Sequence, residues 1–180
     1  MQALKKYILI IAGCAAILSF NTVPAHAQDP VDIMQMIIIA DGYVTMQWAS
    51  AHMKRMHILL ASTLDEKYGI AVQPRGVDVP GFEASMREAQ PKITEDQWGV
   101  LEKIKGTQKF LIVDLRLPDD DDDDDGELRV LLIKLPDRSI EKIGTVALKV
   151  PVDKKKEAFM KELAARCAPH IAKFLKAQHK

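Results

Sequence analysis

The sequence predicts an α+β fold, a single domain with a mainly antiparallel sheet and helices on one face of that sheet. One observation is that runs rich in β-branched residues gather in two places, after residue 33 and again after residue 109. The other is that segments with a helical spacing of apolar residues lie between and after those runs. Strands grouped in this way, rather than alternating with helices, are typical of α+β domains.

Residues 1–27 are predicted to be a secretory signal peptide. Two lysines near the start carry positive charge, residues 8–20 are almost wholly apolar, and Ala25 and Ala27 are the small side chains that signal peptidase accepts. The apolar run is short for a membrane span. We therefore expect cleavage after Ala27, a single exported domain at residues 28–180, and a periplasmic or secreted location.

A second interpretation of this segment is a lipoprotein signal. Residues 11–14, Ile-Ala-Gly-Cys, resemble a bacterial lipobox, in which the cysteine would be acylated. The apolar run continues past Cys14 to Phe20, however, whereas a lipoprotein usually turns polar at this point. We expect Cys14 to be removed, which would leave Cys167 as the one cysteine of the mature chain and exclude an intramolecular disulfide.

The first elements of the mature chain are predicted to be a hairpin and a helix. Ile33–Ala40 and Tyr43–Trp48 are rich in strand-forming residues, and Asp41-Gly42 between them is typical of a type I′ turn. Ser50–Tyr68 has apolar residues at spacings of three and four, which predicts an amphipathic helix that Gly69 ends.

Three shorter elements are predicted in the middle of the chain. Ile70–Val72 is expected to be a short strand, and Phe82–Gln90 a short helix. Thr94 and Gln97 form a capping box, in which each side chain bonds to the backbone amide of the other residue. We expect a helix to begin there and to end at Gly106.

The last part of the chain predicts a three-stranded meander followed by a long helix. The strands are expected at Lys109–Leu117, Leu128–Leu135 and Ile140–Val150. The helix is expected to be capped by Asp153 and to extend to about Ala177, with Pro169 kinking it or splitting it in two.

Methionine and histidine are concentrated in the helix Ser50–Tyr68. His52, Met53, Met56 and His57 would lie within about one turn of one another, and thioether and imidazole groups suit Cu(I). A copper-type metal site is therefore one hypothesis for this chain. The alternative is that Met53 and Met56 continue the apolar face of the helix and fill the core.

The run Asp119–Asp125 begins like an EF-hand calcium loop, with aspartates at alternate positions before Gly126. Leu132 stands where such a loop needs a bidentate glutamate, so this interpretation fails at the residue that completes the coordination. We expect a solvated acidic loop, with weak calcium binding as the alternative.

No motif in the sequence predicts catalysis. A Gly-x-Ser-x-Gly elbow, a His-Glu-x-x-His pair and a phosphate-binding glycine loop are all missing from it. We therefore expect no catalytic residue and no cofactor, with a small enzyme of unfamiliar type as the alternative. Loss of two lysines with the signal would change the net charge from 0 to −2, which excludes a basic nucleic-acid-binding domain.

Residues 94–177 resemble the small periplasmic α/β domain shared by the amino-terminal domain of TolB and the CsgG-type curli-secretion proteins. The likeness rests on a helix, the entry Gly106-Thr-Gln-Lys109 before an apolar strand, a hairpin turn at Lys134–Ile140 and a closing basic helix. The resemblance implies a non-catalytic envelope adaptor and transfers no site residue. Ile33–Tyr68 does not clearly match the first strand and helix of that domain.

These observations together predict an exported, non-enzymatic accessory protein that binds a protein partner in the cell envelope. Metal binding by the methionine and histidine cluster is the alternative function. The C-terminal helix is basic, so a peripheral contact with anionic membrane is also predicted. Its basic residues are Lys154, Lys155, Lys156, Lys161, Arg166, Lys173, Lys176 and Lys180.

Overall fold

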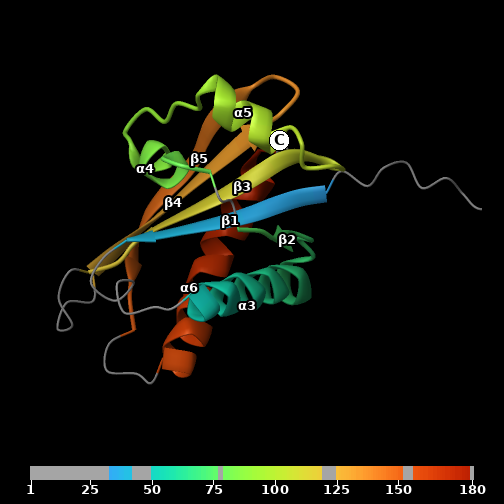
Figure 1. Cartoon of the computed structure of the whole chain (residues 1–180). Coiled ribbons are helices and arrows are strands. Elements are labelled where there is room, and N and C mark those ends of the chain that lie inside the picture. The colour runs from blue at the N-terminus through green and yellow to red at the C-terminus, as the bar shows by residue number, and fades with distance from the viewer. Residues whose placement is uncertain (1–32, 42–49, 77–78, 119–124, 152–155, 179–180) are drawn as a thin grey trace, which may run out of the picture. The chain divides into compact units, whose positions relative to one another are not determined.

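Five strands form one mixed sheet in the computed structural model, which describes residues 33–41, 50–76, 79–118, 125–151 and 156–178. The order across the sheet is β2-β1-β3-β4-β5 (Figure 1). The strands are β1 (Ile33–Asp41), β2 (Gln73–Pro74), β3 (Thr107–Arg116), β4 (Asp125–Lys134) and β5 (Ser139–Lys149). β1 runs parallel to both of its neighbours, whereas β3, β4 and β5 form an antiparallel meander. The predicted α+β class, the mainly antiparallel sheet and the meander are therefore confirmed.

β1 lies inside the sheet because its side chains are apolar in both directions. Met36, Ile37, Ile38 and Ile39 are all buried, two on each face of the strand. The described partners of β1 are β3 along its whole length and β2 at two positions. The second strand of the predicted hairpin, Tyr43–Trp48, and its turn glycine lie outside the described residues.

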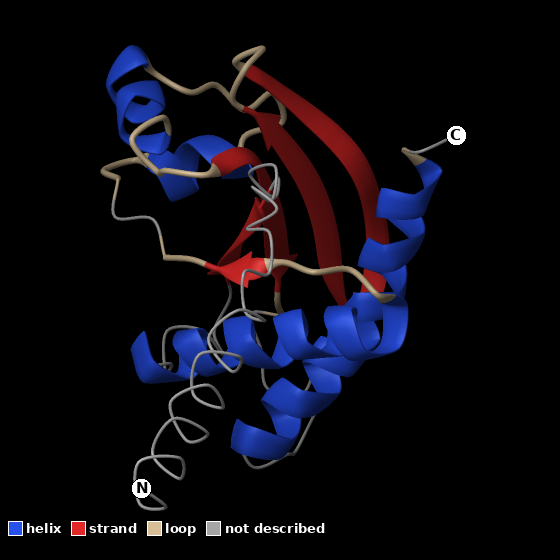
Figure 2. Ribbon diagram, turned by 90° about the vertical axis from the view of Figure 1, so that its right-hand side faces the viewer, coloured by secondary structure: helices blue, strands red, loops and turns tan. Residues whose placement is uncertain are grey.

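Helices cover both faces of the sheet, so the prediction of helices on one face is wrong (Figures 1 and 2). α3 (Ser50–Tyr68) and α6 (Lys156–Ala177) pack on one face, and α4 (Phe82–Arg87) and α5 (Glu95–Leu101) pack on the other. The physical reason is that β3, like β1, is apolar on both faces. Leu111 and Val113 point to the first core, and Phe110 and Ile112 to the second.

The start of α5 and the end of α3 follow the sequence signals closely. Thr94 accepts a hydrogen bond from the Gln97 amide at 3.3 Å, and the Gln97 side chain accepts one from the Thr94 amide at 3.0 Å, which confirms the capping box. α3 ends before Gly69, whose φ of 66° is in the left-handed region that favours glycine. α6 is one helix that continues through Pro169 rather than splitting there.

The contact between α6 and β5 is close enough to exclude a side chain at Gly144. A Cβ atom added at this position would lie 2.5 Å from ring atoms of Phe174 on α6. A side chain at Gly144 would therefore have to displace that ring.

Within the part of the chain that is described, no helix is both long and apolar enough to span a bilayer.

Candidate functional site

The four residues of the predicted metal cluster lie on α3, and the structure gives two of them a role in the core. Met56 is completely buried, and Met53 is half-buried against the same apolar cluster. The Nδ1 atom of His57 lies 2.8 Å from the Met53 carbonyl oxygen, and its Nε2 atom accepts a hydrogen bond of 2.9 Å from the Ile38 amide. The side chain of His52 is outside the described set.

These contacts occupy both nitrogen atoms of His57, as a donor on one side and an acceptor on the other. Burial lowers the pKa of His57, although its hydrogen bond to Met53 works in the opposite direction. Among the described residues no three of histidine, cysteine, aspartate and glutamate gather as a metal site would require. The geometry of α3 favours the core interpretation, and copper binding stays a prediction.

Cys167 lies on the buried face of α6 with none of its surface exposed. Burial raises the pKa of its thiol to about 12, so the thiolate needed for reactivity is scarce at neutral pH. Most of the aspartate run, Asp119–Asp124, is outside the described residues. Its last member, Asp125, begins β4 and forms an ion pair of 2.7 Å with Lys149 on β5.

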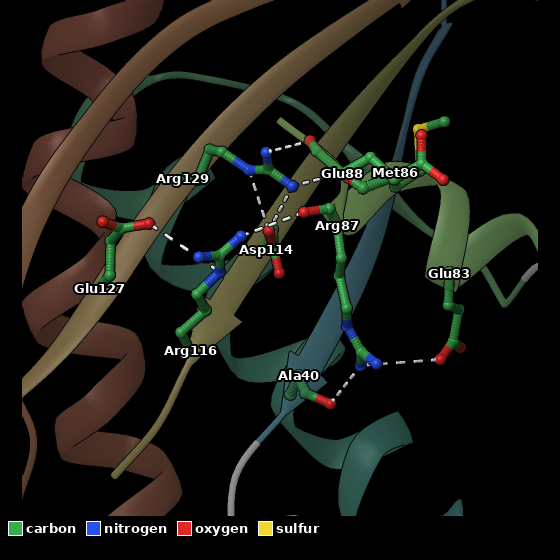
Figure 3. A network of polar contacts seen from close by, with 9 residues as sticks. All are labelled: Ala40, Glu83, Met86, Arg87, Glu88, Asp114, Arg116, Glu127 and Arg129. Atoms are coloured by element: carbon green, nitrogen blue, oxygen red, sulfur yellow. Dashed lines mark hydrogen bonds and ion pairs between the residues drawn. The ribbon is translucent and has the colours of Figure 1, made fainter. Parts of the chain in front are cut away.

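A charged network lies beside the C-terminus of α4, on the face of the sheet that α4 and α5 cover (Figure 3). At its centre Asp114 on β3 stands opposite Arg129 on β4. The Oδ2 atom of Asp114 accepts a hydrogen bond from Arg129 Nε at 2.9 Å, and Arg129 Nη2 lies 2.8 Å from the same oxygen as an ion pair. The side chains are 0% and 5% exposed, so this is a buried ion pair.

Arg129 also binds the last carbonyl groups of α4. Its guanidinium donates to the Glu88 carbonyl at 2.8 Å and to the Met86 carbonyl, and Arg116 donates to the Arg87 carbonyl at 3.1 Å. Carbonyl groups at a helix C-terminus have no helical donor and carry partial negative charge. Two arginines from the sheet therefore hold three consecutive carbonyls and fix the end of α4.

Arg87 and Glu127 complete the network at its outer side. Arg87 reaches back from α4 to donate a hydrogen bond of 2.8 Å to the Ala40 carbonyl on β1. It also lies 4.0 Å from Glu83 one turn earlier. Arg116 is half exposed and lies 3.9 Å from Glu127 on the neighbouring strand. The network thus joins three strands to one short helix.

Two opposing effects act on the pKa of Asp114, and burial is the larger of them. Burial raises the pKa of its carboxyl group, and the neighbouring Arg129 is the main group that lowers it again. Its Oδ1 atom is buried and has no hydrogen-bond partner among the described residues. A guanidinium does not release its proton in proteins, so Arg129 binds and positions its neighbours and does not exchange protons.

Comparison with known protein families and with curated proteins gives no match. TolB from Acinetobacter baumannii is similar in structure at 12% identity over 84% of this chain, with a TM-score of 0.41. This chain spans only 30% of that TolB chain. The hypothetical protein CT253 from Chlamydia trachomatis is similar at 8% identity over 81% of this chain and 98% of its own, with a TM-score of 0.49. No family is shown.

The expected likeness to TolB is therefore present only as a partial structural similarity, and it carries no residue roles to this chain. The charged network was not predicted from the sequence, although a signal for it is present. Asp114 and Arg129 each interrupt an apolar run that forms a strand. A charge in the middle of a buried strand needs a partner of opposite sign. Pairing of Asp114 with Arg129 could therefore have been predicted from these two strands.

Proposed function

We propose that this chain is an exported accessory protein that acts by binding another component of the cell envelope and does not catalyse a reaction. The observation that carries this proposal is that the buried Arg129 makes structural contacts within the fold. Its guanidinium is fully engaged with Asp114 and with the carbonyls at the end of α4. The buried charges of Asp114 and Arg129 therefore stabilise the fold.

A hydrolase or transferase needs a group that exchanges protons or attacks a substrate at an accessible position. The buried titratable groups are poor candidates for such work. Asp114 has no exposed surface, Cys167 is enclosed in the core, and His57 bonds to backbone atoms through both nitrogens. This distribution supports a binding role.

Export rests on the features of residues 1–27, which lie outside the described structure. The charged start, the apolar run and the small residues before Gln28 support a location in the periplasm or outside the cell. The compact unit Asp32–Lys180 begins shortly after the predicted cleavage position. A processed chain would therefore keep every described element.

The first test is the amino-terminus of the protein recovered from the cell envelope or medium of the cells that make it. We expect sequencing to begin at Gln28. A chain that keeps Met1, or begins at an acylated Cys14, would contradict processing by signal peptidase. A chain confined to the cytoplasm would contradict the proposed function itself.

The second test is photocrosslinking of the full chain in intact cells, with the crosslinker placed in turn at exposed positions on α3, α4, α5 and α6. We expect one discrete adduct from a cluster of neighbouring positions and none from the others. Adducts of equal yield from every position would show that no specific partner is bound, and would overturn the proposal.

A further inference from the structure

A groove of about 490 Å³ lies between the C-terminal parts of α3 and α6. These two helices pack against each other on the same face of the sheet (Figures 1 and 2). Its lining consists of Tyr68 from α3 and five residues from α6: Pro169, Ala172, Lys173, Lys176 and Ala177. Its volume is within the range of sites that hold a small molecule or a few residues of a peptide.

The apolar part of the groove is made by residues that leave space. Ala172 and Ala177 extend only a methyl group, and Pro169 lies exposed on the same helix. Tyr68 is half-buried and contacts the apolar core beneath. A partner side chain placed here would therefore meet the tyrosine ring and three small apolar residues.

The charged part of the groove is of one sign. Lys173 and Lys176 are exposed, are three positions apart on the helix, and form no ion pair with any described residue. No acidic residue is among the described residues that line the groove, and none occurs in α6 after Glu162. The helix dipole explains a lysine in the last turn of α6, but it does not explain an apolar recess beside two lysines.

We infer that this groove binds an acidic segment of a partner protein, with one apolar side chain of that segment in the recess. This inference rests on the proposed binding function and names the chemistry of the partner. Two exposed lysines of the lining are complementary to carboxylates, and the apolar lining residues can contact an apolar side chain of the same segment. A flat bilayer would meet the exposed lysines, whereas Ala172 is buried and Tyr68 is half-buried.

The test uses a fluorescein-labelled acidic peptide with one central phenylalanine, mixed with the processed chain and followed by fluorescence anisotropy. The same peptide with serine in place of phenylalanine measures the contribution of the recess. Lys173→Glu with Lys176→Glu reverses the charges of the groove, and Lys54→Glu with Lys161→Glu is the control. The control changes the net charge by the same amount, at one exposed position on α3 and one on α6 that do not line the groove.

We expect the groove variant to weaken binding of the phenylalanine peptide by about tenfold and the control variant to weaken it by less than about twofold. The serine peptide should bind about fivefold more weakly than the phenylalanine peptide. Equal loss in both variants, or equal binding of both peptides, would reduce the interaction to general charge attraction and overturn the inference. All four positions are exposed, so the thermal unfolding midpoints of both variants should equal that of the wild type. If the midpoint of the groove variant is lower, the binding measurement is repeated with the milder variant Lys173→Gln with Lys176→Gln.

Vesicles of phosphatidylglycerol and phosphatidylcholine distinguish the membrane from a protein partner. Binding to the anionic vesicles without binding to the peptide would assign α6 to the membrane surface and overturn the inference. Crosslinking in cells can also give one discrete partner at positions away from Lys173 while the peptide does not bind. That result would overturn the inference about the groove but would leave the proposed function standing. A crosslinker at Lys173 that gives the discrete adduct, while one at Lys161 does not, supports both.

Discussion

At the scale of single residues, the described chain uses its buried charges and polar groups to connect separate elements. Arg129 joins two strands to α4, and His57 joins α3 to β1. Such groups stabilise a fold only when each of them keeps its partner, because an unpaired buried charge costs more than the pair contributes. This asymmetry makes both connections testable by substitution.

Arg129→Met should destabilise the protein by roughly 3–5 kcal/mol, because it leaves the Asp114 carboxylate buried without its guanidinium. The double variant with Asp114→Leu should be closer to the wild type than Arg129→Met alone, since no charge is left unpaired. Urea unfolding of the wild type, the two single variants Arg129→Met and Asp114→Leu, and the double variant measures the coupling energy between the two side chains. A double variant that loses the sum of the two single effects would mean that the pair is not coupled.

Stability should fall on mild acidification because of His57. Burial lowers its folded-state pKa below the unfolded value of about 6.5, so the unfolded chain takes up a proton first as the pH falls. Its contribution is therefore complete above pH 6.5 and is lost as the pH falls through the folded-state pKa. His57→Gln should flatten this part of the pH profile of the free energy of unfolding. If His57→Gln loses as much stability on acidification as the wild type does, the loss comes from another titratable group.

Copper binding can be decided on the same helix. We expect no binding of Cu(I) tighter than about micromolar in a competition titration, because His57 uses both nitrogens and Met56 is in the core. Tight binding that disappears in Met53→Leu and His52→Gln, but persists in a variant at Met86, would restore the metal site.

At the scale of elements, α6 packs closely against β5 at Gly144. Gly144→Ala should cost about 1–3 kcal/mol, because the new methyl group meets the Phe174 ring. Phe174→Leu added to it should recover part of that loss, since the branched side chain leaves the space free. Thermal unfolding of the single and double variants checks this. A neutral Gly144→Ala variant would show that α6 moves away from the sheet without cost.

The elements show which parts of the fold the sequence predicts well. The bounds of α3 agree with the prediction because a sustained apolar period ends at a glycine. The strands of the meander agree within three residues. β2 lies at Gln73–Pro74 instead of Ile70–Val72, because a strand of two residues is defined by its pairing with β1 and not by its own composition.

β5 is an edge strand in the described sheet, and its sequence limits pairing with another chain. The register between β4 and β5 shifts between Val130 and Leu131, which marks a bulge, and Lys142 and Lys149 are exposed along the strand. Bulges and lysines are common ways in which natural sheets avoid association at their edges. These features of β5 agree with a docking surface on the helices and not on the edge of the sheet.

At the scale of the whole molecule, the error about helices on one face has a physical cause. A run such as Ile37–Ile39 is compatible with a hairpin strand or with an interior strand, and only the parallel pairing with β3 decides between them. That pairing joins residues far apart in the sequence. The charged network was missed for the same reason, since Asp114 and Arg129 become neighbours only through the register of β3 and β4.

Removal of residues 1–27 should leave the stability of the folded domain unchanged. The unit Asp32–Lys180 contains both apolar cores and every described contact of the charged network. The chain beginning at Gln28 and a full-length chain that escapes processing should therefore have the same urea midpoint. A lower midpoint for the shorter chain would show that the first 27 residues belong to the domain.

The interior position of β1 also affects how the chain can acquire its structure during export. In the proposed export, β1 would be the first described strand to cross the membrane, and its long partner β3 begins only at Thr107. Ile37 could therefore pair with Ile112 only after the chain between them had crossed. Until then a strand that is apolar on both faces is exposed, which slows folding and invites aggregation. We expect the nascent protein to depend on a holding chaperone on the far side of the membrane.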